Sequence, residues 1–161
     1  MNARFLAVPL LALIAGTAVA EQVQQQVQVT AQIPTDQFYV RPVGSWIGYP
    51  QALQWNAALQ EFGAIRKQFE AKSSLGPIKG YLFDVAEVSD AATGNKFGLK
   101  ITMHGKELKT TATELLTAAQ AGAGAVMDFQ IAAVKPSGGY KVGTYNGFVN
   151  MVFESAAPSG S

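Results

Sequence analysis

Apolar and polar residues alternate with a period of two over residues 21–33. One face of this segment carries Val23, Val27, Val29, Ala31 and Ile33. From Val23 onward Gln25 is the one exception on that face, and the opposite face is glutamine except at Thr30. Such alternation is typical of a β-strand with one apolar side. Pro34 follows and has no amide hydrogen with which to extend a strand ladder, so we predict a strand that ends at residue 33.

The same alternation returns in the second half of the chain. It predicts strands over residues 97–104, 126–134 and 144–154, separated by turns rich in glycine. In the last of these, one face carries Tyr145, Gly147, Val149, Met151 and Phe153. A short strand is expected at residues 38–40, and the β-branched and aromatic residues of 78–88 indicate one further strand.

Two segments are less regular. Residues 111–114, Thr-Ala-Thr-Glu, have the spacing of a capping box and predict a short helix through about Ala119, ended by Gly122 and Gly124. Residues 53–72 fit both a helical stripe and, in their second half, a strand. Many short strands, glycine and proline between them, and one short helix predict an all-β sandwich without a second folded domain.

The first twenty residues have the features of an export signal. Arg4 precedes an apolar stretch over residues 5–15, and small residues occupy positions 17–20. That stretch is well short of the ~20 residues that span a membrane, so we expect cleavage after Ala20 rather than an uncleaved anchor. The resulting division is a signal peptide at 1–20, a leading strand at 21–34 and a β-sandwich at 35–161.

Composition narrows the classes of function. The chain has 161 residues, 12 of them Lys or Arg and 11 Asp or Glu, so it lacks the clustered positive charge that nucleic-acid binding needs. Loss of Arg4 with the signal leaves equal numbers of basic and acidic residues, which permits self-association. Hydrophobic residues make up 48%, enough for a core. There is no cysteine, which excludes disulfides and thiolate chemistry.

Candidate chemistry is sparse. His104 is the only histidine, and it falls on the polar face of its strand beside a turn, where we expect it to be solvated. Asp84, Glu87 and Asp90 are spread over both faces of a strand and into a turn, so we expect solvated carboxylates rather than a cation site. Gly-Ala-Gly at 122–124 lacks the third glycine of a dinucleotide fingerprint. No catalytic residue, metal ligand or cofactor is predicted, and we do not expect an enzyme.

Four stretches of sequence carry a family resemblance. They are Val-Gln-Val-Thr-Ala at 27–31, Leu-Lys-Thr-Thr-Ala-Thr-Glu-Leu at 108–115, Phe-Gln-Ile-Ala-Ala at 129–133 and the closing run 143–153. The chain resembles the major subunits of class 5 (alpha) fimbriae, the colonisation-factor-antigen and cable pilin type of the alternate chaperone–usher pathway. Gly-x-Tyr-x-Gly at 143–147 is shared by many chaperone–usher pilins, whereas Thr-Thr-Ala-x-Glu points to this class. The resemblance also favours a strand over residues 65–72.

The resemblance implies an immunoglobulin-like β-sandwich that lacks one strand and is completed by donor-strand exchange. The apolar face of residues 21–33 would be the donor. The acceptor groove would be lined by Tyr145, Val149, Met151 and Phe153, with Gly147 letting the backbones approach. The implied partners are further copies of the chain in a head-to-tail filament, a periplasmic chaperone, an outer-membrane usher, a tip adhesin and a host receptor. The implied location is the periplasm in transit and then a cell-surface fimbrium.

Two other interpretations fit the residues. A monomeric periplasmic β-sandwich that binds a small ligand or sugar would keep residues 21–33 in its own sheet. In that case Trp46, Tyr49 and Trp55 could line a sugar-binding surface, although we favour core positions for them. A minor or tip subunit is the third interpretation, but tip adhesins of this type carry an additional receptor-binding domain, for which this chain is too short.

Overall fold

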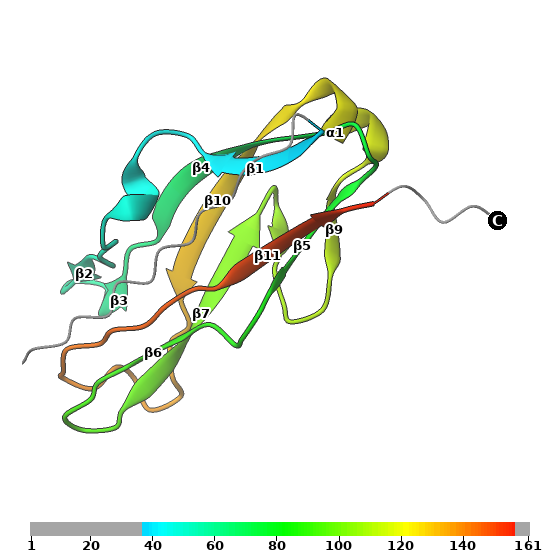
Figure 1. Cartoon of the computed structure of the whole chain (residues 1–161). Helices are drawn as coiled ribbons and strands as arrows, with labels where there is room; N and C mark the ends of the chain where they lie inside the picture. The colour runs from blue at the N-terminus through cyan, green and yellow to red at the C-terminus, as the bar shows by residue number, and fades with distance from the viewer. Residues whose placement is uncertain (1–36, 157–161) are drawn as a thin grey trace, which may run out of the picture. The chain divides into compact units, whose positions relative to one another are not determined.

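The computed structural model describes residues 37–156, which form two β-sheets and a small hairpin (Figure 1). The larger sheet has the strand order β1-β4-β10-β7-β6, with β8 beside β7, and every pairing in it is antiparallel. Its strands are β1 (Phe38–Pro42), β4 (Ile65–Ser73), β6 (Glu87–Ser89), β7 (Lys96–Met103), β8 (Lys106–Glu107) and β10 (Ala125–Ala133).

The smaller sheet has the order β11-β5-β9 and is also antiparallel. Its strands are β11 (Met151–Ser155), β5 (Ile78–Leu82) and β9 (Thr113–Leu116). The remaining elements are the hairpin of β2 (Trp55–Asn56) and β3 (Glu61–Phe62), the 3-10 turn η1 (Trp46–Gly48) and the helix α1 (Ala118–Ala123).

The core lies between the two sheets because alternate residues of each strand point inward. The larger sheet contributes the buried side chains Phe69, Ala71, Ile101, Met103, Met127 and Phe129. The smaller sheet contributes Ile78, Leu82, Leu115 and Leu116. Each large side chain buried here stabilises the fold by about 1.5–3 kcal/mol. The predicted all-β sandwich with one short helix is confirmed.

Most of the predicted strands are present. β1, β7 and β10 begin and end within two residues or so of the predicted bounds. β4 decides the ambiguous segment: residues 65–73 are a strand, and its inner face carries Lys67 beside the buried Phe69 and Ala71. The helical alternative fails because β4 lies between β1 and β10 and bonds to both.

The predicted helix at 111–119 is wrong. Thr113–Leu116 is strand β9, paired with β5, and both Leu115 and Leu116 are buried there. The helix starts at the next capping box, where Thr117 Oγ1 accepts a hydrogen bond from Gln120 N and Gln120 Oε1 accepts one from Thr117 N. Of the two predicted stops, Gly122 lies inside the helix, whereas Gly124 caps it with a φ of 84°.

Two predicted strands are shorter or divided. Residues 78–88 form β5 in one sheet and β6 in the other, because the chain changes sheets between them. Of residues 144–154, only Met151 onward forms β11; the earlier part makes a single bridge between Asn146 and Ser89 of β6. The closing segment therefore runs beside β6 of the larger sheet before it joins the smaller one.

The predicted signal peptide and leading strand lie outside the described residues. The same holds for the donor residues Val23, Val27, Val29, Ala31 and Ile33. Within residues 37–156, no helix is long and apolar enough to cross a membrane.

Candidate functional site

The last strand leaves one side of the smaller sheet open. β11 pairs with β5 on one side, and no second strand partner for β11 exists among residues 37–156. Alternate residues of an antiparallel edge strand direct their N–H and C=O groups to the free side. Such an edge is a template for another extended chain.

An apolar groove of about 250 Å³ lies at the start of this edge strand, whose first residue, Met151, lines it. One wall is formed by the chain after β1, and it consists of Trp46, Ile47, Gln51 and Leu53. The other wall is the segment that leads into β11, and it consists of Gly147, Phe148, Val149 and Met151. The floor is the inner face of the larger sheet, with Ile65, Val88, Leu99, Phe129 and Ile131.

The groove has room for side chains of an added strand. An engineered cavity of about 150 Å³ lined by aliphatic and aromatic residues takes up benzene, so 250 Å³ can hold more than one aliphatic side chain. Only Gln51 among its lining side chains is polar apart from the indole of Trp46. An alternating strand placed here would fill the groove with its apolar face and bond to the β11 edge with its backbone.

The Trp46 wall is held rigidly. The indole ring lies edge-on to Phe69, with centroids 5.2 Å apart, and stacks on Phe129 at 5.8 Å. The Lys67 amine lies 5.8 Å from the centre of the same ring. Gln51 Nε2 donates hydrogen bonds of 2.8 Å to the carbonyl oxygens of Trp46 and Tyr49, which fixes the turn η1.

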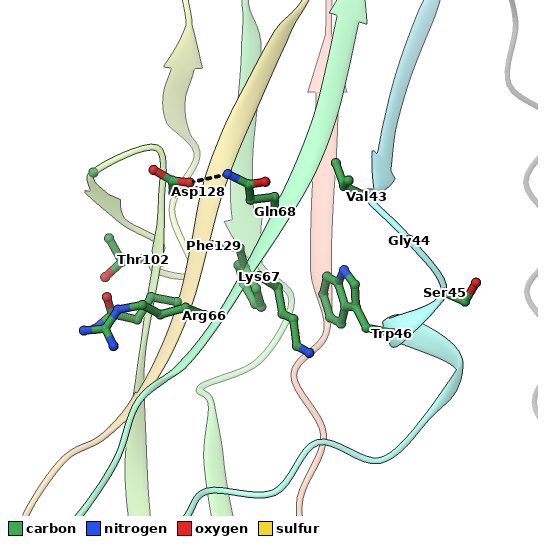
Figure 2. A pocket seen from close by; sticks show the side chains of 12 residues that line it. Val43, Gly44, Ser45, Trp46, Arg66, Lys67, Gln68, Thr102, Asp128 and Phe129 are labelled. Atoms are coloured by element: carbon green, nitrogen blue, oxygen red, sulfur yellow. Dashed lines mark hydrogen bonds between the residues drawn. The ribbon is translucent and has the colours of Figure 1, made fainter.

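A second, wider hollow of about 850 Å³ also has Trp46 and Phe129 in its lining (Figure 2). The wider hollow is more polar, since Arg66 and Thr102 line it together with Gln68, whose Nε2 donates to Asp128 Oδ1 at 3.0 Å.

The Gly147 wall is anchored to β6. Asn146 and Ser89 exchange two backbone hydrogen bonds of 2.9 Å. Asp90, only 5% exposed, accepts from the backbone N–H of Ala92 at 2.8 Å and from that of Thr144 at 3.1 Å. These backbone donors, that of Ala92 foremost, lower the pKa of the Asp90 carboxyl.

The predicted groove residues do not all lie together. Val149 and Met151 line the groove, and so does Gly147, whose close contact is with Glu87 and Val88 of the same subunit. Phe153 instead packs into the core against Gly80 and Phe69. Tyr145 lies in a separate aromatic cluster, 4.9 Å from Phe97.

Sequence reasoning missed the floor and the opposite wall. Ile65, Leu99, Phe129 and Ile131 were visible as the apolar faces of predicted strands, and sandwich packing of those faces would have indicated them. Trp46 and Leu53 come from a segment with no periodicity, so no local signal assigns them to the groove.

The other candidate residues are also placed. The expectation of a core position holds for Trp46 but is wrong for Tyr49 and Trp55, which are 69% and 48% exposed. Tyr49 follows η1 at the surface, and Trp55 packs on Phe62 of the β2–β3 hairpin rather than in the main core. His104 was expected on the polar face of its strand and solvated, but it lies one residue past β7, in the turn, and is half-buried.

Of the three acidic residues, Asp84 and Glu87 are exposed as expected. Asp90 is not solvated: it is buried because it caps two backbone segments. Over residues 37–156, no three His, Asp or Glu side chains come close enough to hold a metal ion.

Comparison with known proteins assigns the fold and the family. The chain matches the family described as CS1 type fimbrial major subunit over residues 23–154. It resembles the solved structure of the CooA pilin subunit from enterotoxigenic Escherichia coli, with a TM-score of 0.59 and 18% identity over 71% of this chain and 86% of that one. No curated protein sequence matches. Since the family match spans most of the sequence, the chain belongs to the CS1 type fimbrial major subunits, which are structural and non-enzymatic components of fimbriae.

Proposed function

We propose that this major fimbrial subunit polymerises by donor-strand exchange, with residues 21–33 of one copy filling the apolar groove of the next. The observation that carries the proposal is that the apolar groove and the alternating segment 21–33 complement each other. The groove lies beside an edge strand without a second partner among the described residues, and residues 21–33 offer one apolar face in strand alternation.

The expected energy suits a stable filament. Full burial of three of the larger donor side chains, Val27, Val29 and Ile33, would contribute about 1.5–3 kcal/mol each, roughly 4–9 kcal/mol together. Backbone hydrogen bonds to the free edge of β11 would add about 1 kcal/mol each. Ala31 adds less because of its size. Removal of the donor costs more than these sums, because polar groups of the groove lose their partners.

The contact is heterologous, since the donor belongs to one copy and the groove to another. Such an interface does not close on itself and propagates a fibre. The glutamine-rich outer face of the donor gives the completed sheet a neutral polar surface, without rows of like charge between neighbouring copies.

The same groove explains the need for helpers during export. An open apolar groove beside an unpaired edge is an aggregation hazard, so the subunit needs a periplasmic chaperone that covers it until the next copy arrives. Exchange would occur at an outer-membrane usher. The assembled fibre would carry a tip adhesin and meet a receptor at the host surface.

Deletion of residues 21–33 behind an intact signal tests the proposal. In cells that assemble the fimbrium, the deleted chain should be exported and held by the chaperone but unable to donate to a neighbour. Electron microscopy and SDS-resistant ladders of sheared surface material measure this. Normal filaments from the deleted chain would refute the assignment of the donor.

A further inference from the structure

One polar atom of the groove lacks a partner. Trp46 Nε1 is fully buried and makes no hydrogen bond to any of the residues 37–156. The indole nitrogen is a donor only, and a buried tryptophan N–H usually finds an acceptor. A buried donor left unpaired costs about 1–3 kcal/mol, so this position calls for an acceptor from outside the described residues.

The ring cannot turn to find one. Phe69 and Phe129 pack on its edge and face, and Lys67 lies over it. Its backbone is fixed by the Gln51 side chain. Figure 2 shows the indole beside Lys67, and the same residue lines the apolar groove. The donor N–H is therefore held in place on a side chain that lines the groove.

The proposed donor segment holds a matching irregularity. Between Val23 and Ile33, Gln25 is the only polar residue on the face expected to enter the groove. A buried glutamine needs partners for its amide, and its carbonyl oxygen is an acceptor. Neither Gln25 nor the Trp46 indole is explained by apolar packing alone.

We propose that Trp46 Nε1 donates a hydrogen bond to the Gln25 side-chain carbonyl of the neighbouring copy and so sets the register of the inserted strand. The inference rests on the proposed donor-strand exchange. A slip of two residues keeps the apolar face inward, but it separates this pair and leaves two polar groups unpaired. A single buried polar residue fixes register in coiled coils by the same logic.

A double-mutant cycle in the full chain tests the pair. Filaments of wild type, Trp46→Phe, Gln25→Val and the double variant are sheared from cells, and their dissociation rates in denaturant are compared. The coupling between the two substitutions should be about tenfold in rate, the factor equivalent to ~1.4 kcal/mol. A cycle cancels the separate effects of each substitution on folding and on apolar burial.

A matched control makes the same kind of substitution at a tryptophan that lies outside the proposed contact. Trp55→Phe replaces a tryptophan of the β2–β3 hairpin, which does not line the groove. The factor by which Trp55→Phe and Gln25→Val modify each other's effect on the dissociation rate should be close to one. Indole N–H resonances of labelled filaments give an independent readout, since only that of Trp46 should move on Gln25→Val.

The outcomes separate the two proposals. A coupling near one between Trp46→Phe and Gln25→Val overturns the pairing, and donor-strand exchange stands if deletion of residues 21–33 still abolishes filaments. If Trp46→Phe weakens the filament equally in the wild-type and the Gln25→Val backgrounds, the acceptor is the strand backbone, which also overturns the pairing. Filaments that survive the deletion overturn both.

Discussion

Gly147 fits so closely against β6 that a single methyl group should disturb the groove wall. A Cβ built at this position overlaps the carbonyl oxygen of Glu87 and lies 3.0 Å from Val88 Cγ1 and 3.1 Å from Val88 Cα. The carbonyl belongs to a strand paired with β7, so it cannot move aside as a side chain would. We therefore expect Gly147→Ala to push the wall away from β6.

The cost follows from what that movement breaks. Separation of the wall from β6 loses the two backbone hydrogen bonds between Ser89 and Asn146, at about 1 kcal/mol each. Overpacking of this kind costs about 1–3 kcal/mol in general. We expect a loss of ~2 kcal/mol, which at ~4 °C per kcal/mol for a domain of this size lowers the melting temperature by roughly 8 °C.

Thermal unfolding of sheared filaments of each variant, followed by circular dichroism, measures this loss. The matched control is Gly138→Ala, because a Cβ there meets nothing within 4 Å. Its effect should stay within about 0.5 kcal/mol. Equal melting temperatures for the two variants would refute the claim that the Gly147 wall depends on contact with β6.

Three further predictions concern the donor, the acid response and the core. Val29→Asp should sharply reduce SDS-resistant filaments whereas Gln28→Asp, the same change on the polar face, should not; equal yields would contradict the assigned faces. The pKa of Asp90 is lowered in the folded chain. Its ionised form therefore stabilises the fold above the unfolded pKa of ~3.9. This contribution is lost as the pH falls through the lower pKa of the folded chain. Urea unfolding from neutral pH downward should therefore show a shallower acid loss for Asp90→Asn than for wild type. Met127→Ala, at a fully buried position, should cost about 2–5 kcal/mol in the same assay, and a smaller loss would indicate a loosely packed core.

Elements whose inner face meets the core were predictable from the sequence. β7 and β10 are long, and their burial alternates, so the period-two pattern shows directly in the residues. β4 was ambiguous because Lys67 occupies an inward position, where it lies over the Trp46 ring, and interrupts the apolar pattern. Tertiary contact, which a local pattern does not contain, decided that segment.

The wrong secondary-structure predictions also arise from tertiary contacts that a local pattern does not contain. Residues 111–114 and 117–120 both have capping-box spacing, and only the pairing of β9 with β5 selects the second. The change of sheet between β5 and β6 leaves Phe83 exposed, although its side chain suits a buried strand. Among the groove residues, Val149 and Met151 were predictable from the alternation of their segment. Trp46 was not, because it lies in a turn that reaches the groove only in the folded chain.

Ser73, at the end of β4, lies close to both the first and the last strand of the described chain. It pairs with Phe38 at the start of β1, and its hydroxyl is 2.6 Å from that of Ser155 at the end of β11. Ile65, at the opposite end of β4, lines the apolar groove. Under the proposed donor-strand exchange each copy is a directional building block, and the fibre has two unlike termini, one with a spare leading strand and one with a vacant groove. A soluble mimic of residues 21–33 would arrest elongation at the vacant-groove terminus alone.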